Sequence, residues 1–221
     1  MARHSDAVVG VLGGTFDPVH YGHLAIARHV LERTGLTRVL MLPSAVPPHK
    51  QAPSVSPARH REAMLRLAME DRPGLELCKV EIDGGEVCYT IDTMRRFRDG
   101  VPPVVPVFVM GMDSLVELPT WKDFRSLIRE FDLIAVDRPD SGDPARPLDP
   151  EVAGAVAELV EGEAPVWQGG RIYRLRIPPI PISSSRIRAL VADGDDLSGL
   201  VPPAVARYIH ANRLYLEEKR R

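Results

Sequence analysis

Short apolar runs rich in β-branched residues alternate with helical stretches along the chain, and this alternation restricts the fold more than any other feature of the sequence. Strands are expected at residues 7–12, 38–42, 76–82, 104–110, 133–136 and 172–177. Helices are expected at 22–33, 57–71, 91–98 and 151–161. Strand, helix and strand in succession are typical of parallel sheets with crossover helices. We predict an α/β fold with a Rossmann-like, doubly wound, mostly parallel sheet and flanking helices.

The length of the chain suits one domain. Its 221 residues exceed an average domain and fall short of two. With 44% hydrophobic residues, a chain of this length buries enough surface to form a core. We therefore expect a single domain over residues 1–221. Its C-terminal helical part, 182–221, is expected to contain a helix at 184–192 and one or two more within 202–219.

The charge and the cysteine content exclude several classes of protein. Lys and Arg number 28 and Asp and Glu 30, so the net charge of −2 provides no general attraction to nucleic acid or to an acidic membrane. Two cysteines are too few for the disulfide framework of a secreted protein, and the N-terminus shows no signal-peptide or membrane-spanning pattern. We expect a soluble, cytoplasmic protein without nucleic-acid or membrane partners, and the sequence leaves a homo-oligomer open.

The most informative stretch is GGTFDPVHYGH, residues 13–23, which lies between the first predicted strand and the first predicted helix. We call it the first motif. Glycines directly after a strand allow the backbone to approach a ligand closely, and free amides at a helix start favour anions. The stretch matches neither the P-loop pattern nor GxGxxG. It therefore predicts a phosphate site of another type.

His20 and His23 are three residues apart, so they project from nearly the same face of the helix start. Such a pair can be structural, can join Asp17 in a metal site, or can donate hydrogen bonds to phosphate. No further cluster of histidines or cysteines supports zinc. The glycine context favours phosphate, with the helix N-terminus adding charge stabilisation.

Two motifs carry a resemblance to a known group of enzymes. The first motif resembles the first signature of the HxGH nucleotidyltransferase superfamily, and ISSSRIR, residues 182–188, resembles its second signature. We call the latter the second motif. The stretches between them resemble one member family, the bacterial nicotinate-nucleotide adenylyltransferases. The supporting segments are 42–50, 89–93, 111–115 and 118–121. The resemblance covers nearly the whole chain and is weakest at 139–170.

The resemblance implies transfer of AMP from ATP to the 5′-phosphate of nicotinate mononucleotide, which forms nicotinate adenine dinucleotide and pyrophosphate in NAD biosynthesis. The acceptor phosphate is already an anion near neutral pH. Direct in-line attack therefore needs no general base, and the protein's task is to align two polyanions and stabilise developing charge. Mg²⁺ would accompany ATP, held mostly by phosphates and water, so no set of protein metal ligands is expected.

At the matched positions the resemblance implies a set of site residues. The catalytic ones are His20, His23, Lys50 and Arg188. Those implied to bind ATP are Gly13, Gly14, Thr15, Phe16, His20, His23, Gly111, Asp113, Ile182, Ser183, Ser184, Ser185 and Arg188. Those implied to bind the mononucleotide are Thr15, Lys50, Tyr89, Thr90 and Trp121.

The residue types suit these roles, although simpler explanations stay open. Ser183–Ser185 open a helix and are either an N-cap or a second set of anion donors. Lys50, in a proline-stiffened loop, reaches a phosphate or is solvated. Trp121 stacks on the pyridine ring or packs in the core. Asp113 contacts a ribose hydroxyl or a Mg²⁺-bound water, or caps a helix.

Other functions remain as alternatives. A phosphopantetheine adenylyltransferase or another member of the superfamily would use the same two motifs. A nucleotide sensor without turnover would keep the glycine turn and lose a charge-stabilising residue, and none is lost here. A class I aminoacyl-tRNA synthetase needs a tRNA-binding body for which this chain has no room.

Overall fold

The computed structural model describes residues 7–45, 55–85, 87–100, 103–137, 147–160 and 162–216. It contains a seven-stranded sheet in the order β3-β2-β1-β4-β5-β7-β6, in which the paired strands run parallel. The strands are β1 (Ala7–Gly14), β2 (Val39–Pro43), β3 (Leu75–Leu77), β4 (Val104–Gly111), β5 (Leu133–Asp137), β6 (Val156–Glu158) and β7 (Ile172–Arg176). The predicted Rossmann-like α/β fold is confirmed.

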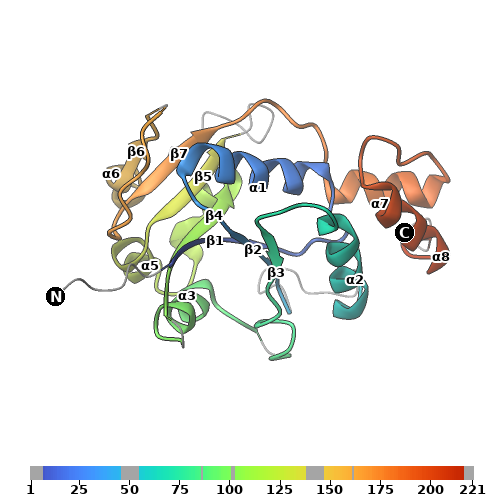
Figure 1. The fold of residues 1–221 in the computed structure, drawn as a ribbon, viewed down its shortest axis with the longest axis horizontal. Helices are drawn as coiled ribbons and strands as arrows, with labels where there is room; N and C mark the ends of the chain where they lie inside the picture. Colours follow the sequence, from blue (N-terminus) through green and yellow to red (C-terminus); the bar gives the residue numbers. More distant parts are fainter. Residues whose placement is uncertain are drawn as a thin grey trace.

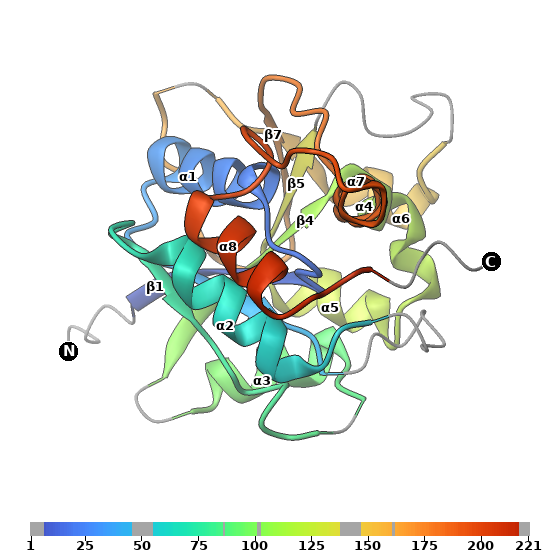
Figure 2. The same ribbon diagram turned by 90° about the vertical axis from the view of Figure 1, so that its right-hand side faces the viewer.

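Helices cover both faces of this sheet. They are α1 (Tyr21–Thr34), α2 (Ala58–Met69), α3 (Thr90–Arg98), α4 (Met112–Glu117), the 3-10 helix η1 (Leu118–Thr120), α5 (Phe124–Glu130), α6 (Pro150–Ala155), α7 (Ser184–Asp193) and α8 (Pro203–Ala211). Figure 1 shows α1 over one face and α3 and α5 on the other. Beyond one end of the sheet lie α7 and α8, and Figure 2 shows α8 packed beside α2.

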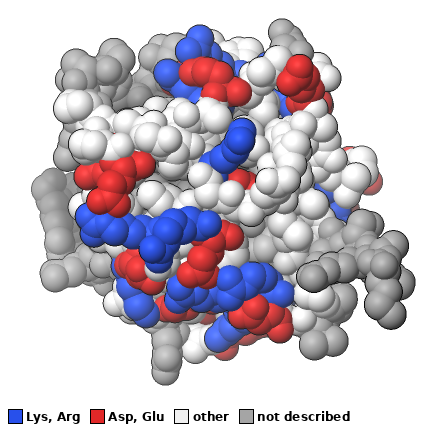
Figure 3. Space-filling model, turned by 90° about the vertical axis from the view of Figure 1, so that its left-hand side faces the viewer, with Lys and Arg blue, Asp and Glu red and all other residues white. Residues whose placement is uncertain are grey.

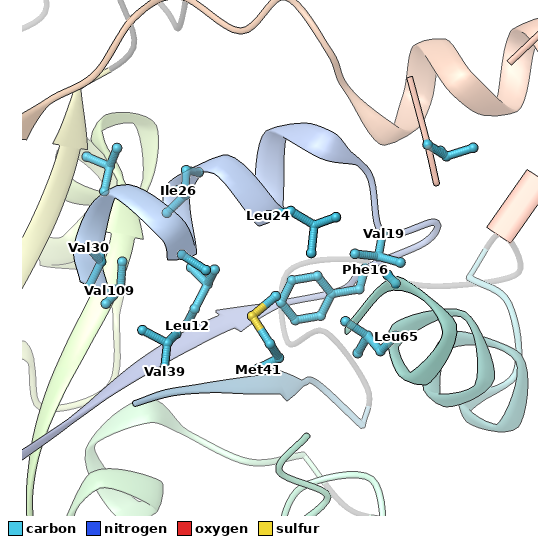
Figure 4. Close-up of a cluster of buried hydrophobic side chains, with 14 of the residues drawn as sticks. Leu12, Phe16, Val19, Leu24, Ile26, Val30, Val39, Met41, Leu65 and Val109 are labelled. Carbon is cyan, nitrogen blue, oxygen red and sulfur yellow. The ribbon is translucent and has the colours of Figure 1, made fainter. Parts of the chain in front are cut away.

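Two hydrophobic cores lie on opposite faces of the sheet because successive strand residues point to opposite sides. In β4, Val107 and Val109 belong to the core under α1, α2, α7 and α8, whereas Phe108 and Met110 belong to the core under α3, α4 and α5. Figure 4 shows part of the first core, where Phe16 points toward Met41 between α1 and α2. The nearly continuous apolar strands predicted from the sequence are therefore buried on both faces.

Two predicted elements differ from the structure. The strand expected at 76–82 is limited to β3, because the chain turns from residue 79, where the N–H of Asp83 donates to the carbonyl of Lys79. The helix expected at 151–161 ends at Ala155, and β6 follows, since the open edge of β7 offers backbone partners there. Within 202–219, where one or two helices are expected, the described residues form α8 and a turn after Ala211. The sequence did not predict α4 or α5.

The surface opposite α7 and α8 carries charges of both signs. Figure 3 shows blue and red side chains interleaved on this face. Ion pairs give this mixture: Arg98 lies 2.8 Å from Glu130, and Arg125 lies 2.8 Å from Glu151. Hydrogen bonds from Arg95 and Arg98 lower the pKa of the Glu130 carboxyl to about 2. In the part of the chain that the structure describes, no helix is long and apolar enough to span a bilayer.

The topology itself positions a site. From β1 the chain proceeds outward to β2 and β3, and from β4 it proceeds in the other direction to β5 and beyond. Ligands of open α/β sheets bind outside the carboxyl ends of the strands where the order reverses. That point lies between β1 and β4, where β1 ends at Gly14 and β4 at Gly111.

Candidate active site

A cavity of about 540 Å³ opens at the carboxyl ends of β1 and β4. Most of the predicted site residues line it. They are Gly13, Gly14, Thr15, His20, His23, Tyr89, Thr90, Gly111, Asp113, Trp121, Ile182, Ser183, Ser184 and Ser185. These residues come from segments up to 172 positions apart, from Gly13 to Ser185, and the fold brings them to one place.

Two predicted site residues that the structure describes do not line the cavity. The Phe16 side chain is 1% exposed and lies in the core, and its backbone φ of 51° is unusual for a bulky residue. Arg188, the last residue of the second motif, points to the first motif, where its Nη1 donates to the Asp17 carbonyl. Lys50 falls outside the described residues.

The two histidines of the first motif stack on each other at the start of α1. Their ring centroids lie 3.8 Å apart. The backbone N–H of His20, the N-cap residue, donates to Nδ1 of His23 at 3.3 Å. Because Nδ1 of His23 accepts this bond, its neutral ring carries the proton on Nε2 and can donate it to a ligand. A Cβ at Gly22 would lie 2.9 Å from the His20 ring, so the glycine leaves the space that this ring occupies.

The second motif meets the first directly. Ser183 is the N-cap of α7, and its Oγ accepts a hydrogen bond from the N–H of Arg186. The hydroxyl of Ser184 donates to the Pro18 carbonyl at 3.0 Å, and Nη1 of Arg188 donates to the Asp17 carbonyl at 2.9 Å. The amides of Ser184 and Ser185, which precede the capped amide of Arg186, have no acceptor within the helix and can serve as anion donors at the cavity.

The other side of the cavity is built from the start of α3 and the segment after η1. Tyr89 is the N-cap of α3, and its carbonyl accepts the N–H of Asp92 at 3.0 Å, so only the amides of Thr90 and Ile91 lack an acceptor within the helix. Trp121 packs edge-on against Phe108, with ring centroids 5.9 Å apart. Nζ of Lys122 lies 4.6 Å from the centre of the Tyr89 ring and forms an ion pair with Asp92 at 2.8 Å. An aromatic surface, the first amides of α3 and a cation thus lie together.

Two residues of this side were missed by the sequence reasoning. Lys122 lines the cavity, and the signal was available, because only four lysines occur in the chain. Glu81 lines it as well, is 8% exposed and accepts a hydrogen bond from the Thr93 hydroxyl at 2.9 Å. Burial raises the pKa of the Glu81 carboxyl, and the bond from Thr93 opposes this shift. No local pattern marked Glu81, which was expected within a strand.

The carboxylates of the cavity suit a hard cation that arrives with its ligand. Among the described residues, no three His, Cys, Asp or Glu side chains gather closely enough to form a metal site. Asp113, in the first turn of α4, lines the cavity and is exposed. Mg²⁺ retains several waters and typically binds one or two carboxylates together with phosphate oxygens. The donor set therefore fits a metal bound through phosphate.

Comparisons with known proteins agree with this geometry. The model of the cytidylyltransferase-like family matches residues 11–190. A nicotinate-nucleotide adenylyltransferase of Symbiobacterium thermophilum is 42% identical over 210 residues, covering 95% of this chain and 96% of the relative. One of Pelobacter propionicus is 37% identical over 212 residues, covering 95% and 98%.

A solved structure extends the comparison to the fold. Plasmodium falciparum nicotinic acid mononucleotide adenylyltransferase complexed with NaAD has a TM-score of 0.74 at 19% identity, covering 96% of this chain and 98% of that one. At this identity the likeness concerns the fold. The matched family model and the relatives, aligned over almost their whole length, show that the chain belongs to the cytidylyltransferase-like family and, within it, to the nicotinate-nucleotide adenylyltransferases.

Proposed function

We propose that this cavity transfers AMP from ATP to nicotinate mononucleotide, forming nicotinate adenine dinucleotide and pyrophosphate in NAD biosynthesis. A phosphate oxygen of the mononucleotide attacks the α-phosphorus of ATP, and the bond from that phosphorus to the bridging oxygen breaks. The single observation that carries the proposal is the meeting of both motifs, joined by the bonds of Ser184 and Arg188 to the first motif, at one cavity.

His20 and His23 act on the triphosphate. Charge accumulates on the leaving pyrophosphate, and preorganised donors in a partly enclosed site stabilise it more than water does. The second motif supplies further donors through the Ser183–Ser185 segment at the start of α7. Arg188 adds positive charge next to this segment, and Lys50 is expected to add charge from its loop.

Thr15 and Phe16 belong at the reacting phosphate. Thr15 lines the cavity, whereas the Phe16 side chain is buried in the core, so only the backbone amide of Phe16 is proposed to contact the phosphate. Tyr89 and Thr90 hold the pyridine carboxylate at the start of α3, and Trp121 stacks on the pyridine ring.

Mg²⁺ is expected to enter with ATP and to neutralise phosphate charge. Asp113 is the exposed carboxylate that can contact one of its waters. Gly111, directly before α4, allows the nucleotide to approach β4 closely, because a Cβ there would meet open space.

One experiment separates this reaction from its alternatives. The protein is incubated with ATP, Mg²⁺ and one acceptor at a time: nicotinate mononucleotide, nicotinamide mononucleotide or phosphopantetheine. We expect pyrophosphate release fastest with nicotinate mononucleotide. Release with phosphopantetheine alone would replace the proposed substrate, and ATP binding without any release would identify a sensor.

We further propose that the chain acts as one domain in the cytoplasm, without nucleic-acid or membrane partners. The seven-stranded sheet draws its strands from residues 7 to 176, which supports one folding unit. Light scattering of the purified protein would determine whether it forms a homo-oligomer.

A further inference from the structure

A polar cluster with two buried members and one half-buried member lies behind the cavity, and the reaction above gives it no role. Its members are Arg61 of α2, Asp17 of the first motif and Tyr215 of the C-terminal turn. Arg61 is 1% exposed and Asp17 is 2% exposed. None of the three lines the cavity.

Arg61 holds three loop segments through their main chain. Its Nη1 donates to the carbonyls of Thr15 (3.0 Å) and Ser44 (2.7 Å), its Nη2 to that of Ala45 (3.1 Å) and its Nε to that of Ser56 (3.0 Å). Thr15 follows β1, and Ser44 and Ala45 follow β2. One guanidinium therefore joins the carboxyl ends of two neighbouring strands at the edge where the cavity opens.

Asp17 connects the same turn to two other parts of the chain. Its carboxylate accepts the N–H of Ser56 at 2.9 Å and the hydroxyl of Tyr215 at 2.7 Å. Burial raises the pKa of Tyr215 far above its usual value, with the charge of Asp17 adding to the shift, so the hydroxyl keeps the proton that it donates. Burial lowers the pKa of Arg61, but an arginine remains charged at neutral pH.

The cost of burying these groups indicates that their arrangement matters. A buried charge is expensive unless it is paired and hydrogen-bonded, and an apolar replacement is often as stable. The bond to the Thr15 carbonyl has a further consequence. In a trans peptide the carbonyl and the next N–H point in opposite directions, so Arg61 also directs the N–H of Phe16 away from itself.

We propose that Arg61, Asp17 and Tyr215 are positioning residues for adenylyl transfer, which set the main chain of residues 14–20 from outside the cavity. The proposal rests on the proposed function. It makes the C-terminal turn part of the active-site support, because the Tyr215 hydroxyl donates to the carboxylate of Asp17, 198 positions earlier in the sequence.

The mildest test removes single hydroxyl groups. Tyr215→Phe is compared with Tyr208→Phe, because the Tyr208 hydroxyl also joins the C-terminal region to α2, at 3.1 Å from His60 Nδ1, but does not touch the first motif. Both variants should lose similar thermal stability. Only Tyr215→Phe should lower kcat, by about 10-fold, because small misplacements of reacting groups cost turnover.

A second pair of variants tests the guanidinium. Arg61→Lys keeps the charge but presents its donors at one point, so it cannot span the same carbonyls. Arg66→Lys is the matched control on the same helix, where Arg66 pairs with Glu62 at the surface. We expect kcat to fall by about 10²-fold or more for Arg61→Lys and to stay at the wild-type value for Arg66→Lys.

The outcomes are distinguishable. Wild-type kcat in Tyr215→Phe, with a lower Tm in both tyrosine variants, would overturn the proposal and leave a purely structural cluster. If Arg61→Lys does not fold, Tyr215→Phe decides.

If the wild type transfers no AMP to nicotinate mononucleotide, the proposed function fails instead. ATP affinity by calorimetry then tests the cluster, and equal affinity in wild type and Tyr215→Phe would overturn it.

Discussion

The two sides of the cavity are built differently. One side, proposed to bind the phosphates and called the phosphate side, carries the two motifs. There His20 is 3% exposed, and hydrogen bonds from α2, α7 and the C-terminal turn hold the first motif. The other side, proposed to bind the pyridine ring and called the pyridine side, is formed by the start of α3 and the segment after η1. There Tyr89 is 40% exposed, and the Lys122 and Asp92 side chains that pair are about half exposed. Charge stabilisation needs donors that are fixed before the reaction. Recognition of an acceptor tolerates exposed side chains that adjust to it.

The largest effect is expected at the phosphate side. His20→Ala should lower kcat by about 10²-fold or more, as loss of a preorganised donor does, and should leave the fold intact. Steady-state kinetics and thermal unfolding measure both. His29→Ala, on the same helix but outside the cavity, is the control. Unchanged turnover in His20→Ala would remove the basis for the comparison.

A smaller effect on the same side tests whether the position of the His20 ring matters when the ring itself is kept. Gly22→Ala adds a Cβ at 2.9 Å from the His20 ring, which must shift. We expect kcat to fall by about 10-fold while both histidines remain. Gly154→Ala is the control, since its Cβ meets open space in α6. Equal kcat in both variants would mean that the His20 ring needs no fixed place.

On the pyridine side, binding should change more than turnover. Trp121→Leu should raise the KM for nicotinate mononucleotide by about threefold to tenfold, the value of an aromatic contact, with kcat nearly unchanged. Trp167→Leu, which loses a ring contact with Tyr173 away from the cavity, is the control. A fall in kcat as large as that of His20→Ala would contradict the distinction between the two sides.

The smallest effect is expected from the exposed cation. Lys122→Met should reduce the kcat/KM preference for nicotinate over nicotinamide mononucleotide by about twofold to fivefold. Only nicotinate carries a carboxylate that can pair with the Lys122 ammonium, and a solvent-exposed charge pair of this kind contributes little. Lys79→Met, outside the cavity, should leave the preference unchanged. The ratio is measured with both acceptors at the same ionic strength. An unchanged ratio in Lys122→Met would assign the preference to the backbone at Thr90.

Periodicity predicted the sheet and the first helices because burial on both faces imposes a pattern on every strand. Periodicity gave the wrong secondary structure where contacts with residues distant in the sequence decide the conformation. Residues 156–158 have a helical pattern, yet they form β6 because β7 offers an open edge. Residues 78–82 have a strand-like composition, yet they turn, and Glu81 pairs with Thr93 instead.

For the candidate site too, the sequence predicted the two motifs but not the residues that support them. The motifs could be found because glycines, paired histidines and a serine run are local features of the sequence. Arg61 was one of 24 arginines and sat in an ordinary helical pattern. Its bonds go to main-chain carbonyls, which have no residue identity, so no sequence pattern could indicate them.

By itself the sequence determined the fold class, the two motifs and the chemistry that their residue types allow, because these depend on local spacing and on side-chain character. Only the tertiary structure decided that the Phe16 ring lies in the core, that Arg188 reaches the carbonyl of Asp17, and that the Tyr215 hydroxyl reaches the Asp17 carboxylate. The physical reason is that these contacts join segments up to 198 positions apart, and chain folding alone sets their distances.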